Sequence, residues 1–422
     1  MSLRSLLFFV MVAPVVIHAQ EADVVRGNAR KYVKNLTAPA LHGRGYVENG
    51  DGLAADWIAQ QFTRMGLLPV KSDYFQPFQF NVNSFPDSVQ VSIDGKRLIP
   101  GTDFIVHPAS GRASGSFDLV HLQPDDLLDP ARRAMSMGVL TGKAACLHFP
   151  KTINSDTLRM YDEVERELMH FCPVVKAAAG KLTWGVAQEA RPFPLIEVLP
   201  ETMTDSSLTV DLRVQNKLLP RHEARNVVGT VKGKGSKWIV IGAHYDHLGH
   251  MGPDALFPGA NDNASGVAMM LSLAEWFSKH KPKHNILFVA FAGEEAGLVG
   301  SEWFIVDRPI DLSKIKLMVN LDMLGTGDDG ITVVNSTAQQ VFFDQLVAIN
   351  TAKQYLPQVK PRGPACNSDH CPFVQKKIPA VFLYTMGGTA AYHDVQDREE
   401  QLPLTKFPEV YALLKDFISG LK

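Results

Sequence analysis

The spacing of hydrophobic residues changes twice along the chain. Between residues 51 and 67 apolar side chains recur at helical spacing and Gly66 follows as a stop signal, so a helix is predicted there, within a segment 21–70 that reads as helical. From about residue 80 to residue 214, short alternating runs of hydrophobic and polar residues are separated by Gly, Pro, Asp and Ser. This second pattern predicts β-strands.

From residue 225 onward, strands and helices are predicted to alternate. Segment 238–243 is continuously apolar, as in a strand that is buried on both faces. Further strands are predicted at 285–292, 316–322 and 380–384, and helices at 265–280, from 299, at 339–351 and at 408–421. This alternation predicts an α/β layered sheet, interrupted by a β-rich insert.

The first 20 residues have the pattern of a secretory signal peptide. A short basic start is followed by a nearly continuous apolar stretch from Ser5 to Ile17, and small Ala19 precedes polar residues. A membrane anchor is the alternative, but a spanning helix needs about 20 apolar residues. We therefore expect cleavage after Ala19 and a secreted or periplasmic protein, with no stable membrane insertion afterwards.

Composition narrows the function classes. Of 422 residues, 45% are hydrophobic and 20% are charged, which are globular values. The formal net charge of −2 lacks the basic excess of an electrostatic nucleic-acid binder, so no nucleic-acid partner is expected. Cys366 and Cys371 are close enough in sequence to form a disulfide, or they remain free thiols, and the pairing of Cys146 with Cys172 stays open.

Histidines and acidic residues gather after the predicted strands, where α/β sheets place their functional sites. Five successive strand ends or loops carry such residues: His244 with Asp246, Asp262, Glu294 with Glu295, Asp322, and His393. Zinc accepts imidazole nitrogen and carboxylate oxygen, and a bridging carboxylate can hold two ions about 3.5–4 Å apart. One carboxylate beyond the ligands can then act as general base. The set predicts a two-metal hydrolytic site.

The sequence resembles the co-catalytic zinc exopeptidases, which include bacterial leucyl aminopeptidases and glutamate carboxypeptidases. The matching stretches are His244-Tyr245-Asp246-His247, Gly259 to Gly266, Phe291 to Ser301, Asn320-Leu321-Asp322-Met323, Ser368-Asp369-His370 and Tyr392-His393. The resemblance implies a three-layer α/β/α fold with a mixed central sheet. It implies a discontinuous catalytic domain at 20–80 and 223–422, after a signal peptide at 1–19. The insert at 81–222 loosely resembles a protease-associated domain.

The resemblance also implies a role for each site residue. His244 and Asp322 would bind one zinc, Glu295 and His393 the other, and Asp262 would bridge the two ions. Glu294 matches the general base, and Tyr392 is a second catalytic candidate, with a wall tyrosine as the alternative. Three further carboxylates are expected around the ligands: Asp246, which would orient His244, together with Asp369 and Asp397.

The expected activity is that of a secreted two-zinc aminopeptidase acting on peptides with a free N-terminus. A carboxypeptidase of the glutamate carboxypeptidase type is an alternative, although Met323 after Asp322 favours the aminopeptidases. A glutaminyl cyclase with one zinc and a binding protein without activity are further alternatives. The ligand set is complete, which argues against the last. Side-chain specificity, oligomeric state and the role of the insert are not determined by the sequence.

Overall fold

The computed structural model describes residues 12–149 and 155–422. The predicted leader, residues 1–19, falls largely outside these residues, and its predicted cleavage point after Ala19 lies within helix α1 (Val12–Leu36). Among the described residues, no helix combines the length and the apolar content needed to cross a membrane.

A mixed nine-stranded sheet forms the centre of the larger lobe. Its strands are β1 (Leu68–Pro69), β2 (Phe75–Ser84), β11 (Lys217–Val231), β12 (Trp238–His244), β15 (Asn285–Phe291), β16 (Ile315–Leu321), β17 (Ile331–Val334), β18 (Val359–Pro361) and β19 (Ala380–Thr385). The order is β1-β11-β15-β12-β16-β19-β17-β18, and β2 pairs with β11. Strands β15, β12, β16 and β19 are parallel neighbours. Their carboxyl ends therefore meet along one edge.

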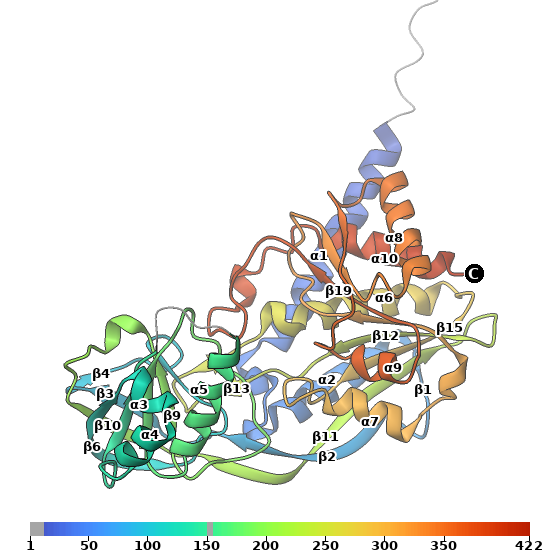
Figure 1. The fold of residues 1–422 in the computed structure, drawn as a ribbon. Helices are drawn as coiled ribbons and strands as arrows, with labels where there is room; N and C mark the ends of the chain where they lie inside the picture. Colours follow the sequence, from blue (N-terminus) through green and yellow to red (C-terminus); the bar gives the residue numbers. More distant parts are fainter. Residues whose placement is uncertain (1–11, 150–154) are drawn as a thin grey trace, which may run out of the picture.

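Helices cover both faces of this sheet (Figure 1). Ile239 and Ile241 of β12 pack with α1, α2 (Gly50–Met65), α6 (Gly266–Lys279), α8 (Gln340–Lys353) and α10 (Phe407–Gly420). Val240 points to the opposite face, where α7 (Val299–Asp307) and α9 (Cys371–Gln375) pack. Because both faces are covered, β12 is buried throughout, as its apolar run predicts. The predicted three-layer α/β/α fold is confirmed.

The insert forms a second, eight-stranded sheet. Its strands are β3 (Val89–Ile93), β4 (Lys96–Arg97), β5 (Phe104–Val106), β6 (Ala113–Leu122), β7 (Ala144–Leu147), β8 (Val174–Ala177), β9 (Leu195–Val198) and β10 (Thr209–Val214). Helices α3 (Pro124–Leu128), α4 (Pro130–Met137) and α5 (Ser155–Leu168) were not expected from the β-like texture. Tyr161, Val164 and Leu168 of α5 pack against Leu147 and Val174. The insert is therefore a sheet partly covered by helices.

Strands β2 and β11 connect the two lobes (Figure 1). They pair over most of their length, with a register shift between Leu219 and His222. The domain boundaries predicted at residues 81 and 222 fall inside these two strands. The same strands thus belong to the central sheet and lead into the insert.

Candidate metal centre

The carboxyl ends of the parallel strands bring the predicted site residues together. His244 is the last residue of β12, and Asp322 directly follows β16. Glu294 and Glu295 follow β15 after a turn at Gly293, whose φ of 68° lies in the left-handed region that favours glycine. The loop after β19 adds His393.

Asp262 lies between the two histidines, one carboxylate oxygen facing each ring. Its Oδ1 is 3.3 Å from His244 Nε2, and its Oδ2 is 3.3 Å from His393 Nε2. Asp322 Oδ1 is 3.4 Å from His244 Nε2, and Glu295 Oε2 is 3.1 Å from His393 Nε2. The site is therefore two clusters of an imidazole and a carboxylate that share Asp262.

Main-chain carbonyls fix the orientation of both rings. His244 Nδ1 lies 3.1 Å from the carbonyl oxygen of Asp246, and His393 Nδ1 lies 2.7 Å from that of Trp184. A carbonyl only accepts, so each Nδ1 carries hydrogen, and each Nε2 is available as a metal ligand once it has lost its proton. Metal-bound histidines are held in this manner. Trp184 belongs to the insert, so the insert positions one of the candidate ligands.

The Asp246 carboxylate lies beside the His244 ring and is held by three hydrogen bonds of its own. Its Oδ1 is 3.8 Å from His244 Nδ1, farther than the main-chain carbonyl of the same residue. Instead the carboxylate accepts the N–H groups of Glu294 and Glu295, at 3.1 and 3.2 Å, and the hydroxyl of Tyr46 at 2.9 Å. Asp246 therefore orients His244 through its backbone and holds the Glu294-Glu295 turn through its side chain.

Two charged residues hold the loop that carries Asp262. The Asp397 carboxylate accepts the N–H groups of Asn261 and Asp262 at 2.8–3.0 Å. The fully buried Arg44 guanidinium donates to the carbonyls of Pro258 and Gly259, both at 2.7 Å, and to that of Asp262 at 3.3 Å. The loop is thereby clamped from both sides, which fixes the position of the shared carboxylate.

Burial perturbs the carboxyl groups of the site strongly. It raises the pKa of Asp246 to about 6 and those of Asp369 and Asp397 to about 7. Burial opposes ionisation of Glu295 too, but the charge of His393 and the hydrogen bonds from His247 and His393 together lower the pKa of Glu295 to about 2. For His393 burial acts to lower the pKa, and the carboxylates of Glu295 and Asp262 raise it to about 11. A positive charge among these buried acids would favour their ionised forms.

The donor set fits zinc. Asp322 Oδ1 is buried and has no hydrogen-bond partner among the described residues, although Ser368 donates to the other oxygen, Oδ2, at 3.0 Å. A buried carboxylate oxygen in this state needs a cation. Imidazole nitrogen and carboxylate oxygen are ligands that zinc accepts. The ligating atoms of His244, Asp262 and Glu295 lie within 4.8 Å of one another, as do those of His244, Glu294 and Asp322.

Tyr392 and His247 border the centre. The Tyr392 ring stacks on His393 with 3.9 Å between ring centroids, and 48% of the residue is exposed. Burial and then the charge of Asp262 raise the pKa of its hydroxyl.

His247 Nδ1 lies 2.8 Å from Glu295 Oε1. Tyr392 is therefore placed where a substrate could reach it, whereas His247 supports a ligand from behind.

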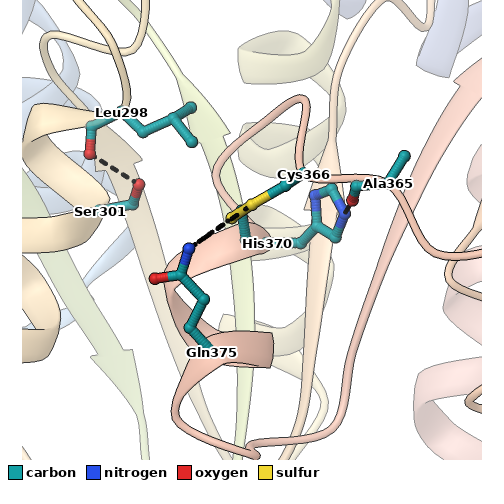
Figure 2. The surroundings of a disulfide bond; sticks show 7 residues. Leu298, Ser301, Ala365, Cys366, His370 and Gln375 are labelled. Carbon is teal, nitrogen blue, oxygen red and sulfur yellow. Dashed lines mark hydrogen bonds between the residues drawn. A yellow bond between two sulfur atoms is a disulfide. The ribbon is translucent and has the colours of Figure 1, made fainter.

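A disulfide joins Cys366 and Cys371 beside the centre, which is one of the two alternatives that the sequence leaves open (Figure 2). Between the two cysteines, His370 Nε2 contacts the carbonyl of Ala365 at 2.8 Å. The bridge closes the short loop that also carries Ser368 and Asp369. Cys146 and Cys172 are free and buried.

Comparison with known proteins relates the C-terminal part of the chain to a known family. Residues 226–418 match the model of peptidase family M28. This part of the chain belongs to peptidase family M28. A probable leucine aminopeptidase of Arthroderma otae is 32% identical to the chain over 199 residues, which cover 44% of this chain and 55% of that one. A probable zinc metalloprotease of Pyrenophora tritici-repentis is 41% identical over 115 residues, or 25% and 26% of the two chains.

Solved structures show the same fold as this chain. An aminopeptidase from an Aneurinibacillus species has a TM-score of 0.62 at 22% identity, with 93% of each chain covered. A zinc aminopeptidase from Bacillus subtilis has a TM-score of 0.68 at 18% identity, covering 93% of this chain and 94% of that one. The chain spans between about a quarter and about half of the length of the curated relatives it matches.

Several residues that support the M28 centre escaped the sequence reasoning. Arg44 and Tyr46 come from the N-terminal segment and Trp184 from the insert, all outside residues 226–418. The one sequence feature that marks Arg44 is the pair of glycines on either side of it, Gly43 and Gly45. In the structure, a Cβ at either position would collide with the backbone of the facing loop. The centre of the M28 domain thus depends on residues that its own segment does not contain.

Proposed function

We propose that this protein is an exported two-zinc aminopeptidase, which removes N-terminal residues from peptides. The observation that carries the proposal is the position of Asp262, whose two oxygens each face a different histidine at 3.3 Å. His244 and Asp322 would hold one zinc, and His393 and Glu295 the other. The names of the aminopeptidase relatives and the metalloprotease relative support the same activity.

Zinc, when bound, acidifies a water molecule and polarises the scissile carbonyl. The residues of the chain hold the ions, orient the ligands and move the proton. Asp262, Asp322 and Glu295 supply the negative charge that retains the ions. The carbonyls of Asp246 and Trp184 keep both imidazoles in the tautomer that presents Nε2.

Glu294 is proposed as the general base. Its ligating atom lies within 4.8 Å of those of His244 and Asp322, and Asp246 accepts its backbone N–H. Burial raises the pKa of this carboxyl well above its usual range, and the charge of Asp369 adds to the effect. The carboxyl can therefore hold a proton taken from water at one of its oxygens and pass it to the leaving amine.

Tyr392 is proposed to line the substrate path. Its ring stacks on His393, and about half of the residue is exposed. Burial and then the charge of Asp262 raise the pKa of its hydroxyl above the usual range, so the hydroxyl stays protonated well beyond neutral pH. A protonated hydroxyl at this place can donate to the oxygen that gains charge during hydrolysis.

Glu294→Gln separates catalysis from metal binding. Because the amide is nearly isosteric and cannot accept a proton, kcat on aminoacyl amides should fall about 10²–10⁴-fold. Zinc content should stay unchanged. Tyr392→Phe serves as the comparison, with a smaller loss. Retained zinc together with retained kcat in Glu294→Gln would exclude this residue as the base.

A substrate panel tests the proposed specificity. Aminoacyl amides, dipeptides and N-blocked peptides are compared with and without chelator. Hydrolysis that requires both a free amine and metal is expected. Cleavage of N-blocked peptides from the carboxyl end would contradict the aminopeptidase assignment.

A further inference from the structure

The insert contains a second cluster of metal-ligating side chains, far along the sequence from the M28 segment. His121 in β6 and Cys146 in β7 are direct partners in the register of two parallel strands. His148 follows the end of β7, and Met203 follows a 3₁₀ turn at Pro200–Thr202. Partnered residues of adjacent strands point to the same side of the sheet. The strand pairing therefore brings imidazole and thiol together.

The distances between the polar atoms are short. His121 Nδ1 lies 2.7 Å from His148 Nε2, and Cys146 Sγ lies 3.8 Å from the same nitrogen. Met203 Sδ is 3.5 Å from Cys146 Sγ. Two ligands placed about 2.0–2.3 Å from a tetrahedral ion are about 3.3–3.8 Å apart. The two sulfur contacts fall in or near this range, and the nitrogen pair would open by roughly half an ångström.

Each of the two rings has an outer partner on the side away from the other ring. His121 Nε2 faces the carbonyl of Ser207 at 2.8 Å, so it carries hydrogen and leaves the Nδ1 lone pair facing His148. His148 Nδ1 in turn faces Asp205 Oδ1 at 3.5 Å. With the His121 proton on Nε2, His148 Nε2 donates to His121 Nδ1 at 2.7 Å in the metal-free site. An ion between the rings would replace this hydrogen bond, with the His148 proton then on Nδ1 beside Asp205. Metal-ligating histidines are held by outer partners of this kind.

We propose that Cys146, His121, His148 and Met203 form a site for one Cu(I) ion. Thiolate and thioether ligands select soft ions, and copper(I) accepts both sulfur types as well as imidazole. Cys146 and Met203 are buried, which suits ligands that must be shielded from water and oxidants. On binding, Cys146 gives up its thiol proton to solvent and forms the copper–sulfur bond, with no change of oxidation state.

A route for the ion lies beside the cluster. His148, Met203 and Asp205 line a cavity of ≈ 610 Å³. Asp205 is exposed, so its negative charge lies where a cation enters. The proposed site therefore has ligands, outer partners and access.

Copper(I) titration of the full chain tests the proposal. The M28 centre is first loaded with zinc, and copper(I) is then offered under anaerobic, reducing conditions in competition with bicinchoninate. One copper per chain should be bound against the chelator. Cys146→Ser and Met203→Leu should weaken binding by about 100-fold or more, above the about 10–100-fold typical of outer partners.

Cys172→Ser is the matched control, because Cys172 is also a buried free thiol of the insert but lies outside the cluster. This variant should bind copper like the wild type. Met203→Leu preserves side-chain volume and covers the case in which Cys146→Ser fails to fold. Absence of copper binding, equal loss in Cys172→Ser, or zinc bound at the cluster in preference to copper would each overturn the proposal.

Discussion

Replacing Arg44 by Met should destabilise the protein far more than an ordinary loop substitution. The guanidinium is fully buried and donates to the carbonyls of Tyr245, Leu36, Pro258 and Gly259 at 2.7–2.9 Å. A methionine fills similar space but donates nothing. Three buried carbonyls would then be left without a donor, and that of Gly259 would keep only the N–H of Ala264 at 3.2 Å.

The magnitude follows from the three carbonyls that lose their donor. A buried acceptor left without a partner costs about 1–3 kcal/mol, so the lower limit for three is about 3 kcal/mol. Water entering the space would recover part of this cost, and removing a buried charge also relieves its desolvation. We therefore expect a net loss of about 3–5 kcal/mol in the free energy of unfolding, with weaker zinc binding because the Asp262 loop is released.

Urea denaturation of the zinc-free and zinc-loaded protein measures both effects. Arg64→Met is the matched control: Arg64 lies exposed on α2, and its nearest polar partner is Gln61 at 3.4 Å. That control should change stability by less than about 0.5 kcal/mol. A loss below about 1 kcal/mol for Arg44→Met, with zinc affinity unchanged, would refute the role of this residue.

Two further predictions concern the insert. Burial lowers the pKa of His107 to about 4, so the folded ring stays neutral while the unfolded ring takes a proton below about pH 6.5. The free energy of unfolding should fall by at most about 3 kcal/mol as pH drops from 6.5 to 4. His107→Asn still offers an acceptor to the Ala109 N–H, and it should abolish this part of the pH dependence. Urea titrations at several pH values measure both. Lys181 donates to the carbonyls of Ala390 and Tyr392 beside the ligand loop, at 2.7 and 2.9 Å. Lys181→Met should lower kcat/KM several-fold in steady-state assays and change the free energy of unfolding by less than about 1 kcal/mol. An unchanged kcat/KM would argue against the idea that the insert helps to position the ligand loop.

The central sheet could be predicted closely from the sequence because its strands are buried on both faces. The runs at 238–243 and 285–292 coincide with β12 and β15 to within a residue. The insert helices were missed for the opposite reason. In α5 the buried Tyr161, Val164 and Leu168 have helical spacing, but polar residues surround them and only one stripe is apolar.

The candidate ligands were predictable because metal chemistry restricts the residue types. Their supports were not, because many of them act through the main chain. Arg44 donates only to carbonyls, and His393 is oriented by the carbonyl of Trp184. A carbonyl belongs to every residue, so no residue type signals its role. For the same reason the sequence does not show that the main-chain carbonyl of Asp246 orients His244 while its carboxylate accepts the N–H of Glu294.

Zinc content per chain tests the proposed two-metal centre most directly. The protein is loaded with zinc, dialysed and measured by mass spectrometry of the metal, beside Asp262→Asn. Two zinc ions per chain are expected for the wild type. Asp262→Asn should retain at most one, because the neutral amide removes the charge that the two ions share. A single zinc in the wild type, with no change in Asp262→Asn, would contradict the two-metal centre.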